Sequence, residues 1–158
     1  MRLLIAAVGK LKQGPERELF AHYLGRAGTV GRKLQLFPID AIEVAEAKAK
    51  AARERIEAEA AALLKKVPPS HQLISLDPRG VNLSSEAFAA LLAKLRDGGT
   101  EGVAFLIGGA DGLQAGARAE KAISLGPMTL PHGLARIVLA EQIYRAATIL
   151  AGHPYHRA

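Results

Sequence analysis

The sequence contains no cysteine and no tryptophan, and its only aromatic residues are four phenylalanines and three tyrosines. The lack of cysteine excludes a disulfide framework, a thiolate nucleophile and any cysteine-based zinc or iron–sulfur site. So few aromatic side chains argue against a stacking platform for single-stranded RNA as the main binding surface. Thiol chemistry and capture of bases by an aromatic surface are therefore set aside.

Long hydrophobic runs are also missing. No uninterrupted apolar stretch approaches the roughly 18 residues that a membrane-spanning helix needs. The run Leu3–Val8 is shorter than the roughly 7–15 residues of a signal-peptide core. With 158 residues, of which 49% are hydrophobic, the chain is nevertheless long enough to bury a sizeable core. We expect a cytoplasmic protein without membrane contacts, folded as a single domain over residues 1–158.

Positive charge is in moderate excess. The 21 lysines and arginines outnumber the 15 aspartates and glutamates, and the formal net charge is +6. Such an excess favours polyanionic partners through long-range attraction and counterion release. Many soluble proteins without a nucleic-acid partner carry a similar charge, so an ordinary solvated surface explains the charge alone equally well.

Short apolar runs alternate with helix-forming segments along the chain. Strands are predicted at residues 2–8, 34–39, 72–76, 103–107 and 123–125. Helices are predicted at residues 15–26, 42–66, 84–96, 115–122 and 131–151. This alternation predicts an α/β fold with a parallel sheet covered on both faces, in which ligands bind at the carboxyl ends of the strands.

The glycine-rich segment 108–112 directly follows the most hydrophobic predicted strand. Glycines at this place let backbone amides approach a ligand closely. The segment is not a dinucleotide-binding fingerprint, because Ile107 occupies the place of the first glycine, and the chain contains no P-loop sequence. A ligand-binding loop and a tight turn without a ligand are both open at this point.

A second loop, Gly126–His132, also follows a predicted strand. Its two prolines stiffen the backbone, and the residues before them are biased away from helical conformation. A rigid and mostly apolar loop suits an adenine or a ribose that is recognised by main-chain groups. A simple turn into the following helix is the alternative.

The C-terminal tail holds an unusual set of side chains, namely His153, Tyr155, His156 and Arg157. Such groups can contact a phosphate or stack on a base, whereas chain ends are more often poorly ordered. Neither a cysteine nor a nearby carboxylate completes a site with the two histidines, so no metal is expected. In the preceding helix, Glu141 and Arg145 have the spacing of an i,i+4 ion pair.

Three segments occur together in a specific order. They are Leu106-Ile107-Gly108-Gly109-x-x-Gly112-Leu113, Met128-Thr129-Leu130-Pro131-His132 and the closing Pro154-Tyr155-His156-Arg157. With these segments, and with the Ala7–Lys10 opening, Leu76-Asp77 and Glu141–Ala146, the whole chain resembles the RlmH (YbeA-type) family. Members of that family are small SPOUT-superfamily methyltransferases that modify N3 of a pseudouridine in large-subunit ribosomal RNA.

The resemblance implies a SPOUT (α/β-knot) fold, in which the C-terminal part of the chain, about residues 72–158, threads a loop to form a trefoil knot. It also implies a homodimer and S-adenosyl-L-methionine as the cofactor. Carried over position by position, the cofactor-binding residues would be Leu76, Gly108, Gly109, Leu125, Gly126, Pro127, Met128, Thr129, Leu130 and His132.

The implied reaction is an in-line displacement at the methyl carbon, which requires the nucleophile and the methyl group to be held in near-attack geometry. Because N3–H of pseudouridine is weakly acidic, its proton must be removed or the developing anion stabilised. The candidate catalytic residues lie in the tail and would act across the dimer: His156 as proton acceptor, Arg157 as positive charge, Tyr155 against the base. We further hypothesise that Arg136 and Arg145 hold RNA phosphates.

Two other functions are compatible with this sequence. One is a non-catalytic ribosome-binding or RNA-binding module of the same fold, although such a module has no need of a cofactor pocket. The other is a SPOUT methyltransferase that acts on transfer RNA. The chain has no appended RNA-binding domain, so shape recognition on an assembled ribosome is the more natural source of specificity.

Overall fold

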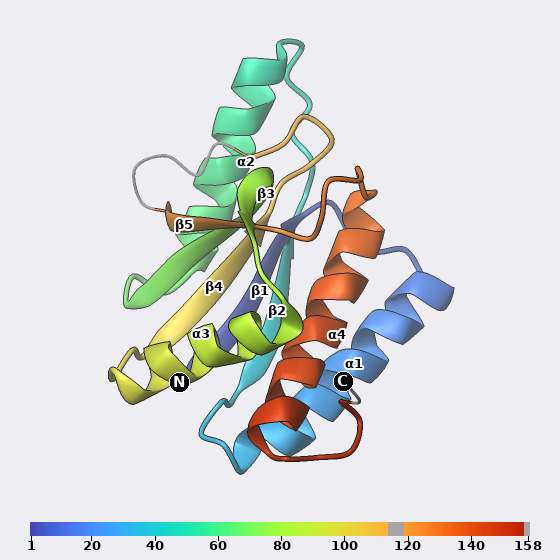
Figure 1. The fold of residues 1–158 in the computed structure, drawn as a ribbon. Helices are drawn as coiled ribbons and strands as arrows, with labels where there is room; N and C mark the ends of the chain where they lie inside the picture. The colour runs from blue at the N-terminus through green and yellow to red at the C-terminus, as the bar shows by residue number, and fades with distance from the viewer. Residues whose placement is uncertain (114–118, 157–158) are drawn as a thin grey trace.

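The computed structural model of the protein describes residues 1–113 and 119–156 (Figure 1). Strands and helices alternate along these residues in the order β1 (Arg2–Val8), α1 (Pro15–Arg32), β2 (Ile39–Val44), α2 (Ala52–Lys66), β3 (His71–Asn82), α3 (Ser85–Asp97), β4 (Gly102–Ile107), β5 (Ala119–Ser124) and α4 (His132–Leu150). Among the described residues, no helix combines the length and the apolar character needed to cross a membrane.

The five strands form one parallel sheet in the order β2-β1-β4-β3-β5. The predicted α/β fold with a parallel sheet is therefore confirmed. Because all strands run in the same direction, their carboxyl ends lie along one edge of the sheet, where parallel α/β proteins bind ligands.

Helices cover both faces of this sheet, with α1, α3 and α4 on one face and α2 on the other (Figure 1). The side chains of β1 alternate between the two faces. Leu3 and Ile5 join the apolar cluster formed with α1, α3 and α4, whereas Leu4 and Ala6 join the cluster formed with α2. Burial on both faces explains why the strands are nearly continuous apolar runs in the sequence.

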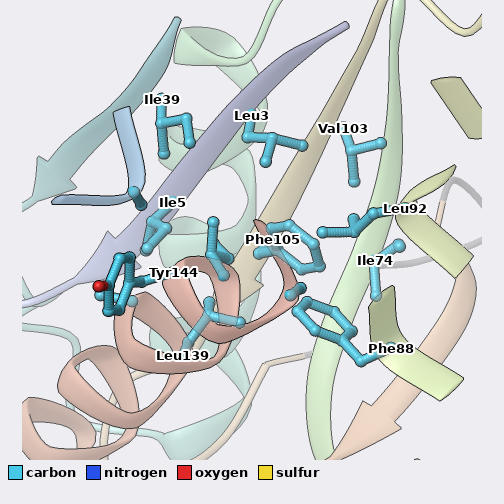
Figure 2. Close-up of a cluster of buried hydrophobic side chains, with 14 of the residues drawn as sticks. Leu3, Ile5, Ile39, Ile74, Phe88, Leu92, Val103, Phe105, Leu139 and Tyr144 are labelled. Atoms are coloured by element: carbon cyan, nitrogen blue, oxygen red, sulfur yellow. The ribbon is translucent and has the colours of Figure 1, made fainter. Parts of the chain in front are cut away.

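The larger of the two clusters fixes α3 and α4 to the sheet (Figure 2). Phe88 of α3 and Phe105 of β4 have ring centroids 5.7 Å apart. Leu139 and Tyr144 of α4 reach the same cluster, and both are buried. Each buried apolar side chain of this size contributes roughly 1.5–3 kcal/mol to the stability of the fold. The start of α4 is thereby held at the carboxyl edge of the sheet.

The first helix is longer than predicted. We expected it to end near residue 26, because Gly25, Gly28 and Gly31 occur around and after this point, but α1 continues to Arg32 with these glycines inside it. Gly31 is buried, and a Cβ atom there would collide with the carbonyl oxygen of Leu36. Gly31 therefore does not end the helix. It allows the segment that follows α1 to pass close to the helix backbone.

The second strand and the second helix lie later in the chain than predicted. We expected a strand at 34–39 and a helix over 42–66, whereas β2 spans Ile39–Val44 and α2 begins at Ala52. The alanines and glutamates of residues 41–49 favour a helix locally. Pairing with β1 overrides this preference, with a register that runs from Leu3 opposite Ile39 to Val8 opposite Val44.

The third strand also extends beyond its prediction. The sequence Asp77-Pro78-Arg79-Gly80 is typical of a turn, but β3 runs through it to Asn82 and pairs irregularly with β5. A Cβ atom on Gly80 would lie 2.7 Å from the backbone of Ala122, so the glycine allows this close pairing. The helix predicted at 115–122 falls partly outside the described residues. Where it is described, from Ala119 onward, the chain forms β5, so the prediction is wrong there.

Four other elements agree with the sequence to within one or two residues. They are β1, α3, β4 and α4. The hydroxyl of Ser84 accepts a hydrogen bond from the backbone N–H of Ala87 at 3.1 Å, as expected for the N-cap of α3.

Candidate active site

A cavity of about 510 Å³ opens at the carboxyl edge of the sheet, between the ends of β3, β4 and β5 and the start of α4. A volume of this size is typical of a small-molecule site. The cavity is lined by Leu76, Asp77, Pro78, Ile107, Gly108, Gly109, Ala110, Gly112, Leu113, Ser124, Leu125, Gly126, Met128, Thr129, Leu130, Pro131, His132 and Ala135. The structure thus brings together both loops that the sequence singled out, and of the ten expected cofactor-binding residues only Pro127 is not part of this lining.

The glycine loop after β4 folds back on itself. The backbone N–H of Gly112 donates to the carbonyl oxygen of Gly109 at 3.1 Å, and the two residues form an isolated bridge. A Cβ atom on Gly108 would lie 2.5 Å from the backbone of Gly112. Gly112 itself has a φ of 90°, which favours glycine. A side chain is therefore excluded at Gly108 and disfavoured at Gly112, and the backbone of these glycines lines the cavity.

Helix α2 supports the glycine loop from the other side. Nε of Arg55 lies 2.7 Å from Oδ2 of Asp111 in the loop, and this bond holds the pKa of the Asp111 carboxyl below its ordinary value. Glu59 is buried, accepts a hydrogen bond from the backbone N–H of Ala47 at 2.9 Å and lies against Gly109. The loop is thus fixed by an ion pair and a packed carboxylate.

The loop between β5 and α4 is stiffened locally. The hydroxyl of Ser124 accepts from the N–H of Gly126 at 3.1 Å and donates to the carbonyl oxygen of the same residue at 3.0 Å. Met128 is 81% exposed at the rim of the cavity. Pro131 is the N-cap residue of α4, which begins at His132, and the free N–H groups of its first turn give this end of the cavity a partial positive charge.

Arg55, Glu59 and Asp77 contribute to the site but are absent from the residues predicted from the sequence. Asp77 follows Leu76 in the cavity wall, and its pKa is lowered by a bidentate interaction with Arg79. The only sequence signal for Glu59 is its place beside the apolar stripe of its helix, between Ile56 and Leu63. Arg55 carries no such signal, because its partner Asp111 lies 56 residues away in the chain.

The structure contradicts the expectation that Arg136 contacts RNA phosphates. Arg136 is only 1% exposed, and its guanidinium donates to Glu43 Oε1 and to the carbonyl oxygens of Val8 and Gly9. Burial lowers the pKa of Arg136, and the nearby carboxylate of Glu43 opposes this shift. A side chain held inside the molecule in this way cannot reach a phosphate on the surface.

The spacing of Glu141 and Arg145 predicted an ion pair, and the structure confirms it. Nη2 of Arg145 lies 2.7 Å from Oε1 of Glu141, and this hydrogen bond raises the pKa of the guanidinium. The guanidinium also lies 5.0 Å from the ring centroid of Tyr155. The contact of Arg145 with RNA phosphates stays a prediction.

The C-terminal tail packs against the chain's own helices, away from the cavity. The rings of Tyr155 and Tyr144 lie 4.6 Å apart, and the Tyr155 hydroxyl donates to Glu141 Oε1 at 3.1 Å. Nε2 of His156 lies 3.0 Å from Oε1 of Glu86. The cavity lies at the start of α4, whereas the tail follows the end of this helix and turns back along it as far as Glu141, in its middle (Figure 1). Neither Tyr155 nor His156 lines the cavity. Arg157 lies outside the described residues.

The amino-acid sequence matches a known family over residues 1–156, and that family is described as predicted SPOUT methyltransferase. The chain therefore belongs to the SPOUT methyltransferase family. Its relatives include proteins named "Ribosomal RNA large subunit methyltransferase H". Those from Xanthobacter autotrophicus and Rhodopseudomonas palustris are each 54% identical to it over 100% of both chains. The protein of that name from Nitrobacter hamburgensis is 49% identical over 99% of both chains.

Among solved structures, the chain is similar to "Crystal structure of TrmJ from Z. mobilis ZM4". The two are 18% identical, with a TM-score of 0.41 over 90% of this chain and 67% of that one. A similarity of this level does not bear on the site. The trefoil knot and the homodimer that the family resemblance implies stay predictions.

Proposed function

We propose that this protein transfers the methyl group of S-adenosyl-L-methionine to N3 of a pseudouridine in large-subunit ribosomal RNA. Membership of a methyltransferase family and the names of its full-length relatives support the reaction class and the RNA. The observation that carries the proposal is the cavity of about 510 Å³, because it is built from the two loops that the family resemblance assigns to the cofactor.

The residues of this cavity fit the chemistry of the cofactor. Apolar side chains such as Leu76, Ile107 and Leu130 suit the faces of an adenine ring. The glycine loop exposes backbone N–H and C=O groups that can recognise ring nitrogens and ribose hydroxyls. The positive end of α4 suits the carboxylate of the amino-acid part. When bound, S-adenosyl-L-methionine supplies the electrophilic methyl group.

The cavity's own contribution is to hold reacting groups in place. Its two loops are braced by the Arg55–Asp111 ion pair and by the hydrogen bonds of Ser124 to Gly126. Because the two loops are already fixed, less conformational entropy is lost when the reacting atoms are brought into near-attack geometry.

The groups that act on the pseudouridine are proposed to come from a partner subunit. Tyr155 and His156 are candidates for contacting the base and accepting its N3 proton, yet in their own chain they contact Glu141 and Glu86 and do not line the cavity. A homodimer in which the tail of one subunit meets the cavity of the other brings both parts together. Arg157 would then supply positive charge to the developing anion.

The RNA partner is proposed to be recognised on an assembled ribosome, which also places the protein in the cytoplasm. The net charge of +6 favours a polyanion, and Arg145 is a candidate for contact with its phosphates. We propose a single domain over residues 1–158, with no metal in the reaction.

A methylation assay tests this function. The purified protein is incubated with isotope-labelled S-adenosyl-L-methionine and with whole ribosomes, separated subunits or naked RNA, and mass spectrometry locates the label. The expected product is a methylated pseudouridine in large-subunit RNA, formed best on ribosomes. If calorimetry shows cofactor binding but no RNA is methylated, the proposed RNA substrate is contradicted. If transfer RNA carries the label, transfer RNA is the substrate instead.

A further inference from the structure

Arg136 is the largest fully buried side chain among the described residues. Its guanidinium donates one hydrogen bond to Glu43 Oε1 at 2.8 Å, one to the carbonyl oxygen of Gly9 at 2.9 Å and one to that of Val8. These acceptors lie 93 or more residues away in the chain. A single side chain of α4 therefore contacts two strands.

The acceptors of Arg136 form the carboxyl edge of the sheet. Val8 ends β1, and Gly9 follows it with its N–H bonded to Val44 of β2 at 2.8 Å. Glu43 belongs to β2, and its Oε1 also accepts from the backbone N–H of Leu11 at 2.9 Å. Arg136 is thus part of a network that joins the start of α4 to two strand ends and to the loop after β1.

The same network lies directly behind the cavity. Pro131, His132 and Ala135 line the cavity, and Arg136 is the next residue of the helix. A Cβ atom on Gly9 would lie 3.4 Å from Nη2 of Arg136 and 3.4 Å from Nε2 of His132. His132 in the cavity wall and the guanidinium of Arg136 therefore both lie next to Gly9 at the edge of the sheet.

Stability alone is a weak reason to bury an arginine at this place. Burial of a guanidinium is costly, and the Nε atom of Arg136 has no hydrogen-bond partner within the described part of the chain. Apolar side chains of similar volume often replace a buried ion pair with little loss of stability, or with a gain. What an apolar side chain lacks is the fixed, planar set of donors that holds three acceptors in one orientation.

We propose that Arg136 is a positioning residue for cofactor binding. It holds the Pro131–Ala135 wall of the cavity in a fixed orientation to the ends of β1 and β2. The cofactor then binds without a rearrangement at the start of α4. This inference rests on the proposed function, because it takes S-adenosyl-L-methionine as the ligand of the cavity.

Two variants test this role. R136K keeps the charge but cannot serve three acceptors from a planar group. The double variant R136M/E43Q removes both charges of the ion pair together, so that Glu43 is not left as an unpaired carboxylate. The control is R96K, because Arg96 donates to the Leu34 carbonyl oxygen at 3.0 Å and pairs with Asp97 at 2.8 Å, and it lies on α3 outside the cavity.

The expected result is a loss of cofactor affinity without a loss of the fold. In calorimetry, the Kd for S-adenosyl-L-methionine should rise about tenfold or more in both Arg136 variants and change less than about twofold in R96K. With ribosomes as substrate, the KM for the cofactor should rise in the same proportion, while kcat at saturating cofactor stays within about threefold of the wild type.

Folded Arg136 variants that bind the cofactor as tightly as the wild type would overturn the inference. If both variants fail to fold, as judged by circular dichroism, Arg136 serves the stability of the fold and the inference is overturned as well. A failure of the proposed function is a different result, because the wild-type protein would then not bind S-adenosyl-L-methionine at all.

Discussion

Glu59 supports the candidate site although it does not line the cavity. Its side chain is buried on the sheet-facing side of α2, where an unsatisfied carboxylate would be costly. The N–H of Ala47 satisfies one oxygen at 2.9 Å, and the carboxylate lies against Gly109 in the cavity wall. Glu59 thus connects the segment before α2 with the glycine loop.

Replacing this carboxylate should therefore affect both stability and binding. In E59A the N–H of Ala47 loses its acceptor, and we expect the free energy of unfolding to fall by about 1–3 kcal/mol. Cofactor affinity should fall too, because the glycine loop loses its support. E59Q keeps an acceptor oxygen and should lose less of both. Chemical denaturation and calorimetry measure the two effects, and wild-type stability in E59A would contradict this role.

The environment of Tyr155 predicts that the stability of the protein depends on pH. Its burial, together with the nearby carboxylate of Glu141, raises the pKa of the Tyr155 phenol from 10.0 to about 12. Between these values the unfolded chain releases the phenol proton while the folded protein keeps it. The folded state then binds more protons, so the contribution of Tyr155 to stability is present below about pH 10 and is lost as the pH rises toward 12.

This pH dependence is measured with Y155F as the control. In the wild type, ultraviolet absorbance should show one phenol that ionises only near pH 12 in the folded protein. In Y155F that step should be missing, and the decline in unfolding free energy between pH 10 and 12 should be shallower. A phenol that still ionises near pH 12 in Y155F would show that Tyr155 is not the shifted group.

Residue types were easier to predict than residue contacts. The sequence drew attention to Tyr155, His156 and Arg136 because they are chemically able to act on RNA. Their contacts depend on tertiary structure, since Arg136 bonds to Glu43, 93 residues away, and His156 to Glu86, 70 residues earlier in the numbering. Local spacing carries no information about such pairs, with the exception of the i,i+4 pair of Glu141 and Arg145.

Among the elements, α1 shows that one residue type serves different purposes within one helix. Gly25 has nothing within 4 Å of an added Cβ atom, whereas Gly31 is packed against the carbonyl oxygen of Leu36. The first glycine only weakens the helix, but the second is required by the close approach of the following segment.

Replacing glycine by alanine should therefore change the free energy of unfolding in opposite directions at these two positions. G25A should raise the free energy of unfolding by roughly 0.5–1 kcal/mol, because alanine is the better helix former. G31A should lower it by about 1–3 kcal/mol, because the new methyl group forces the chain apart. Denaturant unfolding of both variants checks this. A gain of stability in G31A would contradict the packing described at that position.

The elements that were predicted well are those with strong local signals. β4 is an unbroken apolar run, and α3 begins at a serine cap and ends before two glycines. The prediction was wrong where pairing decided the outcome, as in residues 41–49, whose alanines and glutamates favour a helix in isolation although β2 extends to Val44. Both loops of the cavity were predicted for a topological reason: they follow strands of a parallel sheet, whose ends share one edge.

At the scale of the whole molecule, the cavity lies at the start of α4, whereas Tyr155 and His156 of the tail contact the middle of α4 and the first turn of α3. The tail follows the end of α4 and turns back along it (Figure 1). If the tail takes part in methyl transfer, it acts on the cavity of another subunit. Deletion of residues 155–158 should then leave cofactor binding unchanged and abolish methylation of ribosomes. Unchanged turnover in this truncated protein would remove the tail from the mechanism.

A mixing experiment tests the arrangement of subunits. G108A should lose cofactor affinity, because its methyl group would collide with the backbone of Gly112. Neither G108A nor the truncated protein should methylate ribosomes alone. After mixing and subunit exchange, a heterodimer holds one intact cavity and one intact tail that meet, so activity should return to a fraction of the wild-type level. No recovery, despite demonstrated exchange, would contradict action across a dimer.

The central claim is that the cavity at the carboxyl edge of the sheet holds the methyl donor. A crystal structure of the protein with S-adenosylhomocysteine, the product form of the cofactor, tests it most directly. The nucleoside should lie between the glycine loop and the Gly126–His132 loop, in contact with Leu76 and Leu130. Electron density for the nucleoside at any other place, with these two loops free of it, would contradict the claim.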